Sequence, residues 1–104
     1  MIKVKLLPSA WNDLTTIEDW YTVEFSKSSA QKVVNNILKS QERLELFPYS
    51  GSLLPDEKLA KLGYKMVLSG EFASVYKLIN NEIIIYRVVN TRTQYSKLFY
   101  FTHK

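Results

Sequence analysis

The sequence predicts an α+β fold: an N-terminal strand, then an antiparallel helical hairpin packed on a small, twisted antiparallel β-sheet. Two patterns predict this β-α-α-β-β-β order. Apolar residues recur at helical spacing in the first half of the chain, and runs rich in Ile, Val and Tyr fill the second half. A hairpin has one apolar side and a sheet has two, so we expect the far sheet face and the hairpin ends to be open for function.

Length and composition fit one folded unit. The 104 residues, 46% of them hydrophobic, suit a single domain spanning residues 1–104. The chain has no Cys, which excludes a disulfide scaffold and fits a reducing cytoplasm. No run approaches the roughly 20 apolar residues of a membrane span, and the N-terminus lacks signal-peptide architecture. We therefore expect a cytoplasmic protein with no membrane partner.

The chain begins with a short strand and a first helix. Residues 2–7 alternate apolar and basic side chains, which is typical of a strand with one buried face. Pro8 ends this strand, and Ser9 is a good N-cap. Because apolar and aromatic side chains then recur at helical spacing, we predict a helix over about residues 10–25.

The second helix gives the clearest periodic pattern in the chain. Ser28 and Gln31 match a capping box, and the helix is expected over about residues 29–46. Its apolar stripe is interrupted only by Gln41. Since a few residues join the two helices, they should form an antiparallel pair.

Short elements and strands fill the rest of the chain. Residues 55–62 could form one or two helical turns before a glycine. The three expected strands cover residues 64–68, 72–79 and 82–90. Asn80 and Asn81 tolerate the positive φ of a tight hairpin turn. The tail from Thr91 could add a short helix or an edge strand.

Cations and phenols gather in this second half. The candidates for anion binding are Lys61, Lys65, Lys77, Arg87, Arg92, Tyr95, Lys97 and Tyr100. Residues two apart in a strand share a face, so a suitable register would join Lys65, Lys77 and Arg87 in one basic patch. Other roles remain open, since edge lysines discourage strand aggregation and Arg87 could be a structural ion-pair partner. Arg92 could equally cap a turn, and Tyr95 could pack against the sheet end.

The residue inventory favours anion binding over metal or cofactor chemistry. A net charge of +4 favours nucleic acid or an acidic protein as the partner. The sequence has no glycine-rich phosphate loop, and its single histidine is the penultimate His103, so we expect no metal and no cofactor. Cations hold phosphates and tyrosines stack on unpaired bases for about 1–3 kcal/mol each. Such groups could also support metal-free RNA cleavage by orienting the 2′-hydroxyl and spreading the developing charge.

Local patterns along nearly the whole chain resemble the RelE/ParE superfamily of bacterial type II toxins. They are AWNDLTTIEDWY, PYSG, GYK, VYKLINNEIIIYRVV and TRTQY, in that order. The resemblance implies a RelE-like fold and a toxin neutralised by a tightly wrapped cognate protein antitoxin. RelE-like members cut mRNA in the ribosomal A site, whereas ParE-like members inhibit DNA gyrase and cut nothing.

The resemblance carries three functional positions to this chain. For the RelE-like branch, Lys65 matches the lysine after the GY-type strand opening and Arg92 matches the arginine after the last strand. The C-terminal tyrosine matches Tyr95 or, less well, Tyr100. Two further basic positions are absent: Val67 replaces one and Ala73 the other. Either this member lacks the arginine contact, or it belongs elsewhere in the superfamily, or Ala73 was introduced to tame a toxic protein.

Three functions are thus expected from the sequence. The leading hypothesis is a ribosome-associated endoribonuclease acting on mRNA. Its catalytic residues would be Arg92, Lys65 and Tyr95, and its RNA-binding residues would be Lys61, Lys77, Arg87, Lys97 and Tyr100. The alternative is a non-enzymatic ParE-like inhibitor of DNA gyrase. A third is a bare nucleic-acid-binding module.

Overall fold

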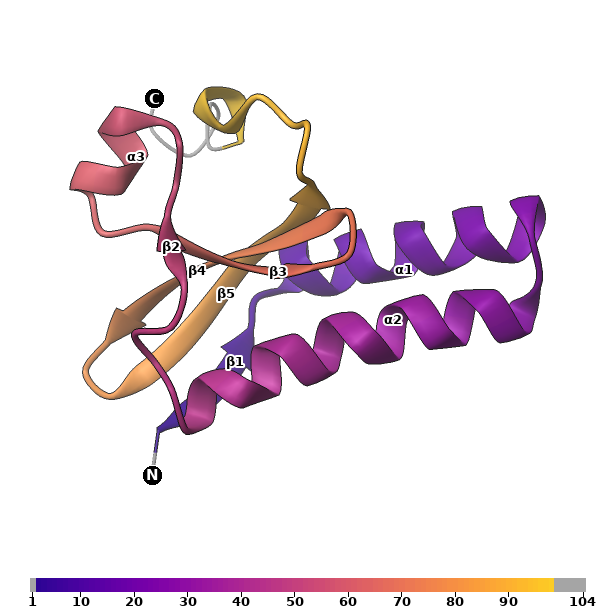
Figure 1. Cartoon of the computed structure of the whole chain (residues 1–104), viewed down its shortest axis with the longest axis horizontal. Helices are drawn as coiled ribbons and strands as arrows, with labels where there is room; N and C mark the ends of the chain where they lie inside the picture. Colours follow the sequence, from indigo (N-terminus) through magenta and orange to yellow (C-terminus); the bar gives the residue numbers. More distant parts are fainter. Residues whose placement is uncertain (1, 99–104) are drawn as a thin grey trace.

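A mixed sheet carries the helical hairpin on one face and two short helices on the other (Figure 1). The computed structural model describes residues 2–98. Within them, five strands stand in the order β1-β5-β4-β3-β2. The strands are β1 Lys3–Leu6, β2 Ser52–Leu53, β3 Lys65–Ser69, β4 Phe72–Ile79 and β5 Glu82–Asn90. The α-helices are α1 Pro8–Glu24, α2 Lys27–Glu42 and α3 Glu57–Lys61, and the 3-10 helices are η1 Arg43–Glu45 and η2 Tyr95–Lys97.

The first strand corrects the expectation of an antiparallel sheet. β1 runs parallel to β5, with Val4 opposite Ile83 and Leu6 opposite Ile85. The other three strand pairs are antiparallel, as expected. A parallel pair needs a long connection, which the hairpin and the three strands between it and β5 supply. The two-residue β2 was not expected, because so short a segment leaves no periodic pattern.

Both helices begin earlier than the sequence predicts. α1 starts at Pro8, whose missing N–H suits the first helical turn, and no side chain caps it. Ser9, the expected cap, instead donates from Oγ to the Tyr86 carbonyl at 2.6 Å. Ser26 rather than Ser28 caps α2, accepting a hydrogen bond from the Ser29 N–H at 3.0 Å.

The hairpin and the sheet enclose the first core. Its members include Leu14 from α1, Ile37 from α2, Tyr76 from β4 and Ile85 from β5. Gln41, the polar residue in the apolar stripe, is buried here. Its Nε2 donates to Ser74 Oγ at 2.9 Å and ties α2 to β4. The end of the hairpin that joins α1 to α2 extends beyond the sheet (Figure 1).

A second core covers the opposite face of the sheet. Leu59 of α3 and Tyr95 of η2 pack there with Ala73 and Val89. The chain after β5 therefore forms a short helix, which decides the alternative that the sequence left open. Among the described residues, no helix has the length and apolar character needed to cross a membrane.

Candidate functional site

The three strand cations do not share a face, so the expected basic patch is wrong. Lys65 of β3 lies opposite Tyr76 of β4, which belongs to the core under the hairpin. Lys77 follows Tyr76 directly and therefore points to the other face. A shift of one residue in register moves a side chain across the sheet, and the sequence did not fix that register.

Arg87 is held in an internal ion pair. Its Nε donates to Asp13 Oδ2 at 2.8 Å, and its Nη2 donates to Asp13 Oδ1 at 3.0 Å. The Val88 N–H also donates to Asp13 Oδ2, at 2.8 Å. The hydrogen bonds that Arg87 donates to Asp13 raise the pKa of Arg87, outweighing the opposite effect of burial. The register between β4 and β5 shifts just here, since Val75 faces Arg87 whereas Tyr76 faces Ile85.

The remaining strand cations lie over tyrosine rings on opposite faces of the sheet. Lys65 Nζ is 5.3 Å from the centre of the Tyr49 ring. Lys77 Nζ is 4.5 Å from the centre of the Tyr64 ring, and it borders Gly63 at the end of α3. Both contacts are cation–π in type, and they leave the ammonium groups able to meet an anion.

Tyr95 and Arg92 lie in different surroundings in the structure. Tyr95 is only 7% exposed, and its hydroxyl donates to Met66 Sδ at 3.7 Å. Burial raises the pKa of Tyr95. Arg92 is exposed, and its backbone N–H donates to Asn90 Oδ1 at 2.9 Å. Tyr95 therefore packs against the end of the sheet, whereas the Arg92 side chain faces solvent.

Five cations lie on or next to segments that contribute to the second core. They are Lys58 and Lys61 of α3, Lys77 of β4, Arg92 after β5 and Lys97 of η2; we call them the second-face basic rim. The packing of α3 on η2 brings these segments together (Figure 1). Lys61 pairs with Glu57 at 3.1 Å, but both side chains are highly exposed. The expected RNA-binding residue Tyr100 lies outside the described residues, as does His103.

The titratable groups of the described chain suit binding better than proton transfer. Burial raises the pKa of Tyr64, Tyr76 and Tyr95, so these phenols stay protonated at neutral pH and are poor bases. Within residues 2–98, no group of three or more His, Cys, Asp or Glu side chains is placed to hold a metal ion.

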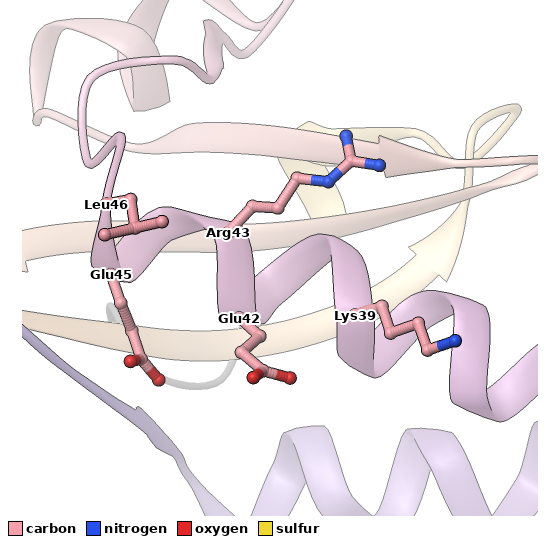
Figure 2. Close-up of a pocket in the computed structure, with 5 residues that line it drawn as sticks. All are labelled: Lys39, Glu42, Arg43, Glu45 and Leu46. Atoms are coloured by element: carbon pink, nitrogen blue, oxygen red, sulfur yellow. The ribbon is translucent and has the colours of Figure 1, made fainter.

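Two hollows on the hairpin were not expected from the sequence. The first lies at the end of α2, encloses 510 Å³ and is lined by Lys39, Glu42, Arg43, Glu45 and Leu46. Figure 2 shows the Arg43 side chain pointing away from the carboxylates of Glu42 and Glu45. The second, of 290 Å³, is lined by Thr16, Ile17, Trp20, Tyr21, Glu71, Phe72 and Asn90. A tryptophan beside the apolar stripe of α1 was the only hint of it in the sequence.

Comparison with known protein families assigns this chain to a family. The model of the ParE toxin of the type II toxin–antitoxin system parDE matches residues 4–95. The chain belongs to the ParE toxin family. It is therefore a toxin of a type II toxin–antitoxin system within the RelE/ParE superfamily.

Solved structures with the same fold include members of both branches. A chromosomal ParDE toxin–antitoxin system from P. aeruginosa is 25% identical, with a TM-score of 0.74 over 86% of this chain and 96% of that one. The RelBE2 toxin–antitoxin complex from Mycobacterium tuberculosis is 16% identical, with a TM-score of 0.62 over the same shares. A conserved hypothetical protein from Helicobacter pylori is 18% identical, with a TM-score of 0.53 over 88% and 96%. Comparison with curated proteins finds no match.

Proposed function

We propose that this ParE-family toxin inhibits DNA gyrase by binding it and does not cleave RNA. The observation that carries the proposal is the separation of the three residues expected to be catalytic. Lys65 lies on the hairpin face, Tyr95 is buried in the second core on the opposite face, and Arg92 is exposed beyond β5. RNA cleavage would need these groups to converge on one phosphate. The family match to ParE supports the same choice.

The position of Ala73 adds support. RelE-like sequences often carry an arginine there, but here the side chain is fully buried in the second core. An arginine at this place would have to displace Leu59 or Tyr95, because packed cores tolerate little extra volume. The simplest explanation is that this toxin never used an arginine contact from β4. A native alanine codon in the chromosomal gene is the expected result.

The second-face basic rim can bind a partner protein without catalysing a reaction. Exposed cations speed encounter with an acidic protein surface and add selectivity, while apolar anchors supply most of the affinity. One such anchor lies directly after α3, because Leu62 is half exposed. Large exposed apolar side chains mark interaction sites for gyrase or for the antitoxin.

Membership of this family implies that a cognate antitoxin is made in the same cell. Because the structural neighbours are toxin–antitoxin systems, a cognate antitoxin is the supported partner. We propose that a segment of it lies over the sheet and the hairpin, held partly by the cations. Co-expression of the adjacent small gene should then abolish growth inhibition.

One experiment separates the two toxin mechanisms. The chain is induced and mRNA is mapped by primer extension, while the purified chain is added to a gyrase supercoiling assay. We expect supercoiling to be blocked while mRNA stays intact. Codon-positioned cuts that disappear in Arg92→Ala, with supercoiling unaffected, would instead establish the endoribonuclease and overturn the proposal.

A further inference from the structure

The 290 Å³ hollow beside α1 is built from segments far apart in the sequence. Helix α1 supplies Trp20 and Tyr21, the turn before β4 supplies Glu71, and the two middle strands supply Phe72 and Asn90. We call it the hairpin cavity. None of the residues expected from the sequence to be functional lines it, although Asn90 accepts a hydrogen bond from the Arg92 N–H of the second-face basic rim.

Aromatic rings form the walls of the hairpin cavity. The Trp20 and Tyr21 rings meet edge to face with centroids 4.9 Å apart, and the Tyr21 and Phe72 rings do so at 6.2 Å. Phe25 stacks on the other side of Tyr21 at 5.6 Å. Trp20 remains 54% exposed and Phe25 65% exposed. Partly exposed aromatic groups around a cavity are typical of the centre of a protein-binding site.

The charge at this cavity is opposite to that of the chain as a whole. The chain carries +4, yet α1 contains Asp13, Glu18, Asp19 and Glu24 and no Lys or Arg. Asp13 is neutralised by Arg87. Glu71 lines the cavity, and within residues 2–98 its carboxylate forms no ion pair. The lining of the cavity therefore carries one carboxylate, that of Glu71, and no cationic side chain, so it can attract a cation.

Aromatic faces next to a carboxylate recognise a cationic side chain. The ring quadrupole attracts an ammonium or guanidinium group, and a desolvated contact contributes about 2 kcal/mol. A guanidinium adds planar stacking on aromatic faces and paired hydrogen bonds to a carboxylate. The cavity volume suits one long side chain rather than a larger ligand.

We propose that the hairpin cavity receives an arginine or lysine side chain of the antitoxin, whose neighbouring apolar residues cover Val23 and Phe25. This inference rests on the proposed toxin–antitoxin function. The antitoxin is the occupant that the structural neighbours support, and charge complementarity fixes the sign of the side chain. The antitoxin would then carry a basic anchor for this cavity in addition to acidic residues for the second-face basic rim.

A direct test uses the fluorescence of Trp20. The chain has two tryptophans, so Trp11→Phe leaves Trp20 as the only one. The purified variant is titrated with N-acetyl-arginine methylamide and with the neutral citrulline analogue of the same shape. We expect a saturable change with arginine that is at least fivefold weaker with citrulline and is lost when Glu71→Gln is added. Equal responses to both compounds would overturn the proposal.

A second test uses the product of the small gene adjacent to this one. Its Kd is measured for the wild type, Glu71→Gln and Trp20→Ala, with Glu82→Gln and Trp11→Ala as matched controls of equal folded stability by thermal melting. We expect the two cavity variants to weaken binding at least tenfold and both controls to stay within twofold. An effect of Trp20→Ala without one of Glu71→Gln indicates an apolar occupant and overturns the basic anchor.

The outcomes keep this inference separate from the proposed function. If the complex forms and neither cavity variant weakens it, the basic anchor is wrong while the toxin–antitoxin pair stands. If no complex forms, the adjacent product is not the antitoxin of this toxin, which counts against the proposed pair; the arginine titration then decides by itself whether the cavity takes a cationic side chain, and its failure overturns the basic anchor.

Discussion

Arg87 and Asp13 explain at the scale of single residues why a cation sits inside a buried strand. Asp13 is 16% and Arg87 31% exposed at the side chain, and three hydrogen bonds satisfy the carboxylate. Burying either charge alone would be costly. The pair fastens α1 to β5 and removes Arg87 from the groups that are free to meet a ligand.

Asp13→Ala should therefore destabilise the fold strongly. The expected loss is about 2–4 kcal/mol, below that of a fully buried pair because some solvent reaches Arg87. Urea unfolding measures it, and a cycle with Arg87→Ala isolates the coupling. Lys61→Ala breaks the exposed pair with Glu57 and serves as the control, with a loss under about 0.5 kcal/mol. Similar losses for the two pairs would contradict the assignment of Arg87 as structural.

Tyr76 predicts a dependence of stability on pH. Its hydroxyl donates to the Pro48 carbonyl at 3.2 Å and accepts from the Gly51 N–H at 3.1 Å. Burial raises the pKa of Tyr76 above 10.0, partly offset by the hydrogen bond from Gly51. The pKa of Tyr76 is thus higher in the folded protein than in the unfolded chain. The stability that this difference contributes is fully present below the unfolded-state pKa, and it is lost as the pH rises through the folded-state pKa.

The free energy of unfolding should thus fall more steeply in the wild type than in Tyr76→Phe as the pH rises above the ordinary tyrosine pKa of 10.0. At neutral pH the variant should lose about 1–3 kcal/mol, because two backbone groups lose their partner. Urea titrations at several pH values measure both effects. Parallel pH profiles for the two proteins would show that Tyr76 does not titrate differently on folding.

At the scale of elements, local capping and long-range packing compete to set helix ends. Ser28 and Gln31 match a capping box by sequence, yet α2 begins two residues earlier, at Lys27, with Ser26 as its N-cap. The extra residues continue the helix because the turn from Phe25 lets Ser26 accept from the Ser29 N–H. The second helix also tightens into η1 at its end, where Leu44 is fully buried in the first core.

Ser26→Ala should cost about 1 kcal/mol, because the Ser29 N–H loses its acceptor. Ser28→Ala is the matched control, since it removes a hydroxyl two residues away that caps nothing; its cost should be within about 0.5 kcal/mol. Thermal unfolding of the two variants side by side makes the comparison. A larger effect of Ser28→Ala would restore the boundary that the sequence predicted.

At the scale of the whole molecule, charge and apolar surface are separated. Cations surround the second core on one face, whereas acidic and aromatic groups occupy the end of the hairpin on the other side. Two partner surfaces of opposite sign are thereby available on a small chain. A toxin that must bind both a target and an antitoxin can use such a division for selectivity.

Charge reversal on the second-face basic rim should weaken gyrase inhibition. The paired variant Lys58→Glu with Lys97→Glu is expected to raise the inhibitory concentration at least tenfold, or about 1.4 kcal/mol. Lys3→Glu with Lys5→Glu on β1 changes the net charge equally and should stay within twofold. The difference should shrink at high salt, because exposed charges are screened. Equal effects of the two pairs would mean that only net charge matters.

The sequence alone determined the order of the elements, because periodicity and turn residues are local properties. The last two strands, Phe72–Ile79 and Glu82–Asn90, agree with their predicted ranges to the residue. The family also followed from the sequence, since the order of short patterns along the chain is specific. Even the ion-pair role of Arg87 was among the open alternatives, because an arginine in an apolar strand requires a partner.

Only the tertiary structure decided which side chains meet. Strand register placed Lys65 and Lys77 on opposite faces, parallel pairing placed β1 at the sheet edge beside β5, and Tyr95 of η2 became buried in the second core. The hairpin cavity joins Trp20 to Glu71 across some fifty residues of chain. Such contacts depend on packing between distant segments, and a local pattern does not encode the alignment of two segments that pack only after folding.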